Sequence, residues 1–314
     1  MAQRSRKIAI AIHGGAGTLM KGMMTPEKEV EYKNALQKAL DAGYQAIQSG
    51  KSSVDATELA VRILEDSTLF NAGKGSVFTA DGTHEMDAAI MEGATLNAGA
   101  VALVNGIKNP ISLARDVMEK SDHVLLAADG AMEFALKMGY EFEDPEYFYD
   151  EFRYQQWQEI RDTDQFQLDH STKKDSKFGT VGAVACDQQG TIAAATSTGG
   201  MTNKRYGRIG DSPLIGSGNY ANNNTCAVSC TGSGEYFIRA VVAYDVSCLM
   251  EFKGLELEQA AFEVVHHRMV RIGGDGGLIA VDKYGNLTMP FNTEGMYRAA
   301  KDSDGLSQLS IYKD

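Results

Sequence analysis

A threonine directly after a glycine, Thr180 after Gly179, is the residue of this chain best suited to act as a nucleophile. A threonine hydroxyl is weak on its own, but a threonine that begins a polypeptide carries its own base, because its free α-amine accepts the hydroxyl proton. That amine titrates at about pH 7.7 to 8.0 in model peptides, close to neutral pH. Gly179 lacks a Cβ, so its carbonyl can take the strained geometry that attack by the Thr180 hydroxyl demands. The pair predicts an enzyme that is made inactive and cuts itself between these two residues.

Hydroxyls and bare backbone amides recur at the ends of later predicted strands. They are Thr196, Thr198 and the run Thr231-Gly232-Ser233-Gly234. Such groups are the components of an oxyanion hole, which stabilises the negative charge that develops when an amide is attacked. The same residue types also simply make turns, and a lone Gly-Thr-Val is a weak signal because threonine is common in strands.

Arg208 and Asp211 stand three residues apart in a glycine-rich loop, 207–213, that follows the threonines. An isolated pair of this kind is usually a surface ion pair of little consequence. Its position after the candidate nucleophile favours a second interpretation. Arg208 would bind a carboxylate and Asp211 an ammonium group, so that the two clamp a zwitterionic substrate.

Other catalytic designs find little support. A Gly-x-Gly-x-x-Gly motif that starts at Gly15 would need a glycine where Met20 stands, and no Gly-x-Ser-x-Gly elbow occurs. The six histidines show no metal spacing, and we interpret the run that starts at His13 as a tight turn leaving the first strand. We therefore expect neither a catalytic metal nor a histidine base, and no cofactor for catalysis.

Composition excludes several classes of protein. The 314 residues carry 42 acidic and 30 basic side chains, a net charge of -12, which repels nucleic acid and anionic membranes. No apolar run approaches the roughly 18 residues of a membrane span. The cysteines, at 186, 226, 230 and 248, lack metal or disulfide spacing, and reduced thiols in a cytoplasmic protein are their simplest explanation.

The elements that would position these residues follow from hydrophobic periodicity and end signals. We expect a buried strand at 7–13 and a helix that begins at Pro26 behind Thr25 and ends at Gly50. A second helix should open at Ser52-Ser53. Further strands are expected at 85–91, 98–104, 181–187, 191–198, 226–231, 277–281 and 287–291, and further helices at 110–120, 129–138, 235–252 and 256–271.

Residues 141–178 differ from their surroundings, because they are charged, aromatic and poor in strand signals. This composition is typical of a mobile linker, with enough aromatic side chains at roughly 146–162 for a peripheral helix. Placed directly before Gly179, such a linker would give a freed chain end room to move.

The motifs together resemble the plant-type L-asparaginases, also called isoaspartyl peptidases or β-aspartyl-peptidases, of the N-terminal nucleophile hydrolases. The similarity covers nearly the whole chain. It lies in the blocks 12–17, 69–73, 179–184, 196–204, 207–213, 229–235 and 276–279.

The resemblance implies one α+β domain, a four-layer αββα sandwich, cut into chains 1–179 and 180–314 that form a homodimer of cleaved protomers. It implies Thr180 as nucleophile, Thr198 as the neighbour that positions it, and Asn71 close by. Thr231 and the Gly232 amide would form the oxyanion hole. Arg208, Asp211, Gly232 and Gly234 would hold the substrate. In some relatives a loop binds sodium through backbone carbonyls, here those of Leu64, Glu65, Ser67, Phe70, Ala72 and Lys74.

The implied activity is hydrolysis of the side-chain amide of L-asparagine and of the isopeptide bond in β-aspartyl dipeptides, releasing L-aspartate. One alternative is a glycosylasparaginase-like amidase, although those enzymes place aspartate before the nucleophile, where this chain has Gly179, and carry a leader sequence that we do not find here. The other is an amino-acid-binding protein on the same scaffold that never cleaves.

Overall fold

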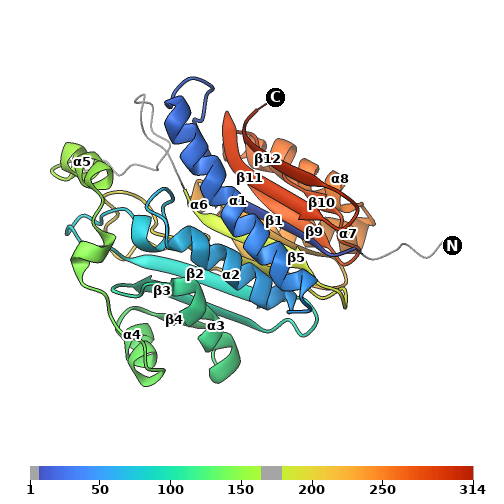
Figure 1. The fold of residues 1–314 in the computed structure, drawn as a ribbon, viewed down its shortest axis with the longest axis horizontal. Coiled ribbons are helices and arrows are strands. Elements are labelled where there is room, and N and C mark those ends of the chain that lie inside the picture. The colour runs from blue at the N-terminus through green and yellow to red at the C-terminus, as the bar shows by residue number, and fades with distance from the viewer. Residues whose placement is uncertain (1–6, 164–178, 314) are drawn as a thin grey trace.

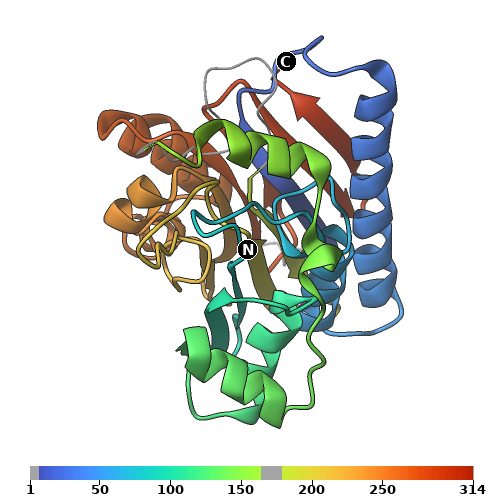
Figure 2. The same ribbon diagram turned by 90° about the vertical axis from the view of Figure 1, so that its left-hand side faces the viewer.

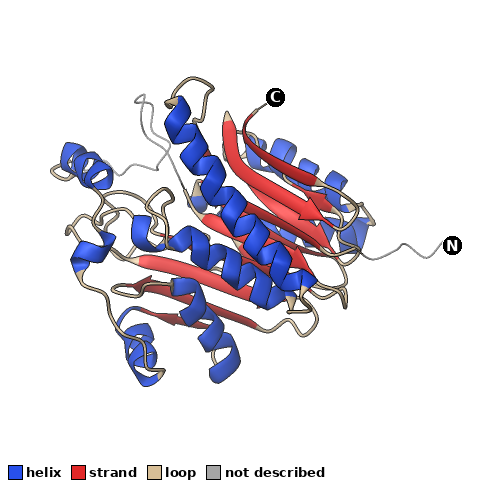
Figure 3. Cartoon of the chain, viewed as in Figure 1, coloured by secondary structure: helices blue, strands red, loops and turns tan. Residues whose placement is uncertain are grey.

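Two β-sheets stacked face to face form the centre of the computed structural model, which describes residues 7–163 and 179–313. Helices cover the outer face of each sheet (Figure 3). In Figure 2 the long helix α1 stands on one side and the helices beyond residue 234 on the opposite side, with the strands between them. The expected α+β fold with four layers, αββα, is confirmed.

The first sheet has eight strands within the described ranges, in the order β12-β11-β1-β5-β6-β2-β3-β4 (Figure 1). Its neighbours pair antiparallel except β3 and β4. The strands are β1 (Ala9–Gly17), β2 (Met86–Glu92), β3 (Ala98–Val104), β4 (Leu125–Ala127), β5 (Val181–Cys186), β6 (Ile192–Thr198), β11 (Gly295–Asp302) and β12 (Ser307–Tyr312). The predicted hairpin of β5 and β6 is confirmed, whereas sequence reasoning missed β4, β11 and β12.

The second sheet pairs four described strands in the order β10-β9-β8-β7. They are β7 (Asn219–Ala221), β8 (Cys226–Gly232), β9 (Gly276–Asp282) and β10 (Leu287–Thr288). Alanines fill much of the space between the two sheets, including Ala9 and Ala11 of β1 against Ile279 and Val281 of β9. Through this layer of small side chains, β5 and β6 of the first sheet pack against β8 of the second.

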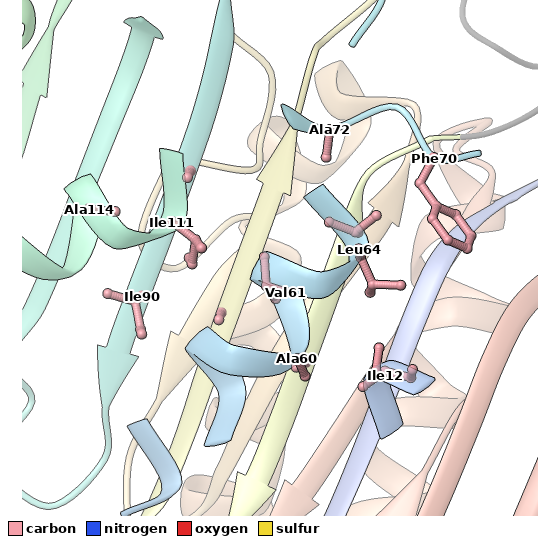
Figure 4. Packing of buried hydrophobic residues seen from close by; sticks show 14 of the residues in the cluster. Ile12, Ala60, Val61, Leu64, Phe70, Ala72, Ile90, Ile111 and Ala114 are labelled. Carbon is pink, nitrogen blue, oxygen red and sulfur yellow. The ribbon is translucent and has the colours of Figure 1, made fainter. Parts of the chain in front are cut away.

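Helices α1 (Pro26–Gln48), α2 (Ser53–Glu65), α3 (Pro110–Lys120) and α4 (Ala128–Lys137) belong to the first sheet. Both predicted helix starts are confirmed: the Thr25 hydroxyl accepts from the Lys28 amide, and Ser52 and Asp55 form a reciprocal capping box. Figure 4 shows the packing beneath them, with Leu64 of α2 close to Ile12 of β1.

The second sheet is covered by α6 (Gly234–Ala240), α7 (Val242–Lys253), α8 (Leu257–Glu263) and α9 (Met269–Arg271), with a π-helical turn at Val264–Arg268 joining the last two. The single helix predicted over 235–252 is wrong in one respect. Val241 adopts a left-handed conformation, with φ of 50°, and divides the segment into α6 and α7. No helix in the parts of the chain that the structure describes is long and apolar enough to cross a membrane.

Residues 141–163, the described part of the predicted linker, are folded onto the first half of the chain. They form a 3₁₀ turn at Pro145–Phe148 and α5 (Glu151–Ile160), which lies at the edge of the molecule in Figure 1 and corresponds to the expected peripheral helix. The Trp157 ring stacks on Phe78 at a centroid distance of 5.6 Å. A mobile linker is therefore wrong for this part, and the remainder, 164–178, lies outside the described residues.

Candidate active site

The candidate nucleophile lies at the start of β5, beside the end of β6. Val181 pairs with Ser197, which places Thr180 next to Thr198 across the ladder. Thr180 is only 8% exposed, and its Oγ1 lies 3.4 Å from the Oγ of Ser212. Thr198 Oγ1 accepts a hydrogen bond from the Gly200 amide at 3.1 Å, which fixes the hydroxyl at the end of its strand.

Asn71 ties the loop after α2 to the strand that carries Thr198. Its side-chain NH2 donates to the Gly200 carbonyl at 2.8 Å, while its side-chain oxygen accepts from the Val77 amide at 3.1 Å. The Asn71 carbonyl accepts from the Gly199 amide at 3.0 Å. Asn71 is 1% exposed, so these bonds hold a neutral donor-acceptor group next to the candidate nucleophile.

The tight turn predicted after His13 is wrong, because β1 continues through Gly17. A β-bulge between His13 and Ala16 takes up the glycines. Gly15 has a φ of 111°, and a Cβ built there would lie 2.6 Å from the Gly179 nitrogen. The bulge therefore brings the backbone of β1 against the predicted cleavage site, as closely as glycine alone permits.

His13 contacts the nucleophile residue itself, a contact that sequence reasoning missed. Its Nδ1 lies 3.1 Å from the Thr180 carbonyl and its Nε2 2.9 Å from Ser229 Oγ. Burial lowers the pKa of His13 to about 3, so the ring is neutral. Nδ1–H therefore donates to Thr180, and Nε2 accepts from the Ser229 hydroxyl.

The His13 bond begins a buried polar chain between the two sheets. Ser229 Oγ lies 2.7 Å from Thr196 Oγ1, which accepts from the Asn219 side chain at 3.0 Å. A Cβ on Gly182 would stand 2.4 Å from His13 Nε2 and 2.0 Å from Ser229 Oγ, so glycine at that position leaves room for the chain. Thr196, predicted as a possible component of the oxyanion hole, is instead a member of this buried hydrogen-bonded chain.

The predicted oxyanion pair lies at the end of β8. Thr231 is 1% exposed, and its Oγ1 accepts from the Ala16 amide of the β1 bulge at 3.3 Å. Gly232, the next residue, lines the same cavity as Thr180. The two strands that carry the nucleophile and the candidate oxyanion donors belong to different sheets, so the site depends on how the sheets stack.

Arg208 is held by an acidic residue that sequence reasoning did not assign. Its Nε and Nη2 donate to the two carboxylate oxygens of Glu235 at 3.0 and 3.1 Å, a bidentate pair. Glu235 lies in the first turn of α6, directly after Gly234. A Cβ on Gly234 would stand 3.0 Å from Arg208 Nη2 and 2.9 Å from Asp211 Oδ1, which places this glycine against both clamp residues.

Asp211 is a buried carboxylate with one oxygen, Oδ2, that has no hydrogen-bond partner among the described residues. Burial raises its pKa to about 7, while Arg208 opposes that shift. A buried oxygen without a partner is costly to the fold, and an ammonium group beside it would supply both charge and donors.

One cavity brings most of the predicted residues together. Its wall is formed by Asn71, Gly179, Thr180, Thr198, Gly200, Met201, Arg208, Gly210, Asp211, Ser212 and Gly232. Thr231 and Gly234 adjoin this wall without forming it. In the continuous chain the cavity measures about 20 Å³. That is room for about one water molecule, too little for an amino acid.

The loop expected to bind sodium runs from the end of α2 to the 3₁₀ turn Gly73–Gly75. The carbonyl oxygens of Phe70, Thr68 and Ser67 lie 2.1, 2.9 and 3.0 Å from the point where a Cβ on Gly75 would stand. These three carbonyl oxygens therefore crowd Gly75 at the turn, and two of them, those of Phe70 and Ser67, belong to the expected ligand set.

The Glu65 side chain points toward β6, where its Oε1 accepts a hydrogen bond from Ser197 Oγ at 2.6 Å. Its burial raises the pKa of that carboxyl to about 8. The residue before Thr198 is thereby joined to the beginning of the loop.

Comparison with known proteins identifies the family of the chain. A family model described as asparaginase matches residues 6–311. An isoaspartyl peptidase of Escherichia coli (strain K12) is 50% identical over 311 residues, 98% of this chain and 97% of that protein. A putative isoaspartyl peptidase/L-asparaginase of Dictyostelium discoideum is 44% identical over 98% of this chain and 100% of that protein. A plant-type L-asparaginase of Pyrococcus furiosus is 44% identical over 92% of this chain and 94% of that protein. On the strength of the family match and these full-length similarities, the chain belongs to the asparaginase family.

Proposed function

We propose that this protein hydrolyses the side-chain amide of L-asparagine and the isopeptide bond of β-aspartyl dipeptides, with release of L-aspartate. Both substrates share an α-ammonium, an α-carboxylate and a side-chain carbonyl that bears the amide. One observation carries the proposal: a candidate nucleophile, Thr180, shares a cavity with a cation, Arg208, and a buried carboxylate, Asp211. The names of the relatives, isoaspartyl peptidase and L-asparaginase, describe the same chemistry.

The enzyme matures by cutting its own backbone between Gly179 and Thr180. The Thr180 hydroxyl attacks the Gly179 carbonyl, the C–N bond breaks as the nitrogen takes a proton, and water hydrolyses the resulting ester. The products are chain 1–179 with a new carboxylate and chain 180–314 with a free α-amine. The small cavity supports this step, because in the continuous chain, with Gly179 in its wall, its volume of about 20 Å³ is too small to hold asparagine.

In turnover the freed amine of Thr180 accepts the proton of the Thr180 hydroxyl, which then attacks the substrate's side-chain carbonyl. Thr231 and the Gly232 amide stabilise the oxyanion, and Thr198 and Asn71 position the nucleophile. The neutral His13 does not act as the base, because its Nδ1–H is donated to the Thr180 carbonyl and its basic Nε2 faces the Ser229 hydroxyl. The C–N bond of the tetrahedral intermediate then breaks, and ammonia from asparagine, or the amine of the dipeptide, leaves with the proton that the Thr180 amine had accepted. Water finally attacks the ester on Thr180 and releases aspartate.

A structural sodium ion belongs to the proposal. The backbone carbonyls of Leu64, Glu65, Ser67, Phe70, Ala72 and Lys74 would hold it, because a hard cation prefers oxygen ligands and backbone carbonyls supply them. When bound, it neutralises carbonyl dipoles and stiffens the loop that carries Asn71. Replacing sodium by a bulky organic cation at constant ionic strength should lower the melting temperature, and an unchanged melting temperature would contradict this part of the proposal.

We also propose that the cleaved protomers form a homodimer and that the enzyme works in the cytoplasm. The four cysteines are free thiols, which suits a reducing compartment. Light scattering of the purified protein tests the first statement, and fractionation of the source cells tests the second.

The decisive experiment follows the backbone cut by intact-mass spectrometry and denaturing electrophoresis of freshly purified protein. Active protein should contain two chains, one ending at Gly179 and one beginning at Thr180, in place of the 33.9 kDa precursor. Thr180→Ala should remain uncut and inactive, whereas Thr180→Ser, which keeps a hydroxyl, should cut slowly. Active material with an intact chain would overturn the mechanism, and an intact chain that binds aspartate without turnover would favour the amino-acid-binding alternative.

A further inference from the structure

A second and much larger cavity, which we call the aromatic hollow, lies beneath the folded segment 142–149. It measures about 640 Å³ and shares no lining residue with the active-site cavity. Its lining residues are Phe78, Gly82, Thr83, His84, Asn105, Gly106, Phe142, Glu143, Pro145, Glu146, Phe148 and Tyr149. The volume falls within the range of about 300 to 1,000 Å³ that is usual for sites of small organic ligands.

Five of the lining residues of the hollow carry aromatic rings: Phe78, His84, Phe142, Phe148 and Tyr149. Phe78 packs against His84 at 4.2 Å between ring centroids and against Tyr149 at 6.3 Å, and Phe148 lies 5.8 Å from His84. Phe142 and Tyr149 are 39% and 45% exposed, although large aromatic side chains gain most from burial. Ring faces that remain accessible in a concave site offer a surface to a ligand.

The charges around the hollow are predominantly negative. Glu143 and Glu146 line it, and burial lowers the pKa of His84 to about 4, so the ring adds no positive charge at neutral pH. Lys74 and Lys108 lie over the ring of Tyr147, at 5.0 and 5.7 Å, and neither lines the hollow. Aromatic faces together with carboxylates are the combination that recognises an ammonium group, through cation–π attraction and direct charge pairing.

We propose that the aromatic hollow binds an organic ammonium ion with an apolar or aromatic body and no carboxylate. The rings contact the body and the ammonium group, and Glu143 and Glu146 neutralise the charge. An amino-acid zwitterion is a poor ligand, because its carboxylate would lie beside two others. The hollow therefore selects amines against the amino acids that the active site handles, and it does so independently of the proposed hydrolysis.

The test is a binding measurement by isothermal titration calorimetry on the purified full-length protein, with four probes of similar shape. Phenethylammonium should bind, 2-phenylethanol should bind roughly tenfold more weakly, and phenylalanine and 3-phenylpropionate should bind more weakly still. Glu143→Gln combined with Glu146→Gln should weaken phenethylammonium roughly tenfold and leave 2-phenylethanol unchanged. Glu141→Gln, a neighbouring acidic residue outside the lining, is the matched control and should have little effect.

A second pair of variants separates the rings from simple apolar contact. Tyr149→Leu keeps an apolar side chain but removes a ring face, and should weaken phenethylammonium about three- to tenfold. Phe152→Leu changes an equally exposed ring on α5 that does not line the hollow, and should change nothing. The proposal is overturned if phenethylammonium binds no more tightly than 2-phenylethanol, if the glutamate variants bind it like the wild type, or if no binding occurs at millimolar probe. Because the readout is binding, the result stands whether or not the chain hydrolyses amides.

Discussion

The two halves of the candidate active site are built on different principles. The nucleophile half, Thr180 with Thr198 and His13, lies on strands and is held by hydrogen bonds between uncharged groups. The clamp half, Arg208 with Asp211 and Glu235, lies in a loop and the first turn of a helix, and is held by charges. The strand register fixes the positions of the side chains in the nucleophile half. In the clamp half, Asp211 has an oxygen without a hydrogen-bond partner in the described part of the chain, and Arg208 is paired with a carboxylate that a substrate can replace.

This difference separates chemistry from recognition. Attack on a carbonyl requires fixed distances between nucleophile, base and oxyanion donors, which a paired strand supplies. Recognition of a zwitterion requires charges that remain available, such as the unpartnered Oδ2 of Asp211, and these destabilise an empty site. Variants in the two halves should therefore fail in different ways.

The largest effect should come from the oxyanion pair. Thr231→Val removes a hydroxyl donor while preserving shape, and kcat for L-asparagine should fall about 10²- to 10³-fold with little change in KM. Thr231→Ser, which keeps the hydroxyl, should recover most of the rate. Steady-state kinetics on fully cleaved protein checks this, and a wild-type kcat in the valine variant would remove Thr231 from the mechanism.

Loss of the cation should break recognition and spare the backbone cut. Arg208→Ala should lower kcat/KM for L-asparagine roughly 30- to 100-fold, mainly through KM, because a bidentate charged contact with the α-carboxylate is lost. The rate of self-cleavage, followed by mass spectrometry, should stay within a factor of about two, because the uncut peptide bond between Gly179 and Thr180 offers Arg208 no carboxylate to bind. A parallel loss of cleavage would mean that the two halves are not independent.

The pH profile should reveal Asp211. Its pKa is raised to about 7, so below pH 7 its carboxylate is protonated and no longer attracts the substrate ammonium. For L-asparagine, kcat/KM should lose about a further tenfold for each unit that the pH falls below 7. Succinamate, which lacks the α-amine, serves as the control. Its kcat/KM profile should show only the ionisation of the Thr180 amine. Identical profiles for both substrates would show that Asp211 does not pair with the ammonium.

His13 tests whether uncharged support matters to the nucleophile half. His13→Phe fills the space but removes both hydrogen bonds, leaving the Thr180 carbonyl and the Ser229 hydroxyl buried without this partner. Both self-cleavage and kcat should slow about tenfold, and the free energy of unfolding should fall by about 1 to 3 kcal/mol. Chemical denaturation at pH 7 and single-turnover kinetics measure the two effects. Full activity in a destabilised variant would assign His13 to stability alone.

Local signals allowed much of this molecule to be predicted from its sequence. Helix starts at Thr25 and Ser52 follow from capping chemistry within four residues, and the β5–β6 hairpin follows from a turn between two apolar runs. Thr180, Arg208 and Asp211 could be singled out as candidate site residues for the same reason. Each lies in a motif whose residue types already indicate a chemistry.

Long-range partners could not be predicted. His13 meets Thr180 across 167 residues, and its neighbouring glycines are equally typical of the turn that was expected there. Glu235 meets Arg208 across 27 residues and has no spacing that marks it as a partner. The extra strands β11 and β12 find their places by pairing beside β1, which is a property of the assembled sheet. Aromatic residues at 142–149 looked like a linker because their ring partners, such as Phe78 and His84, lie far away in the sequence.

The smallest expected effect concerns the exchangeable charge in the clamp. Glu235 occupies two donors of Arg208, and a substrate carboxylate must compete for them. The Glu235 side chain is 53% exposed, so the pair is weak in water, and Glu235→Gln should lower KM for L-asparagine only about threefold with kcat unchanged.

Glu119→Gln, which removes a half-exposed carboxylate from Arg115 far from the site, is the matched control and should leave KM alone. A raised KM in Glu235→Gln would mean that Glu235 orients Arg208 for the substrate. In that case the clamp would be as fixed as the strands, and the contrast between the two halves would disappear.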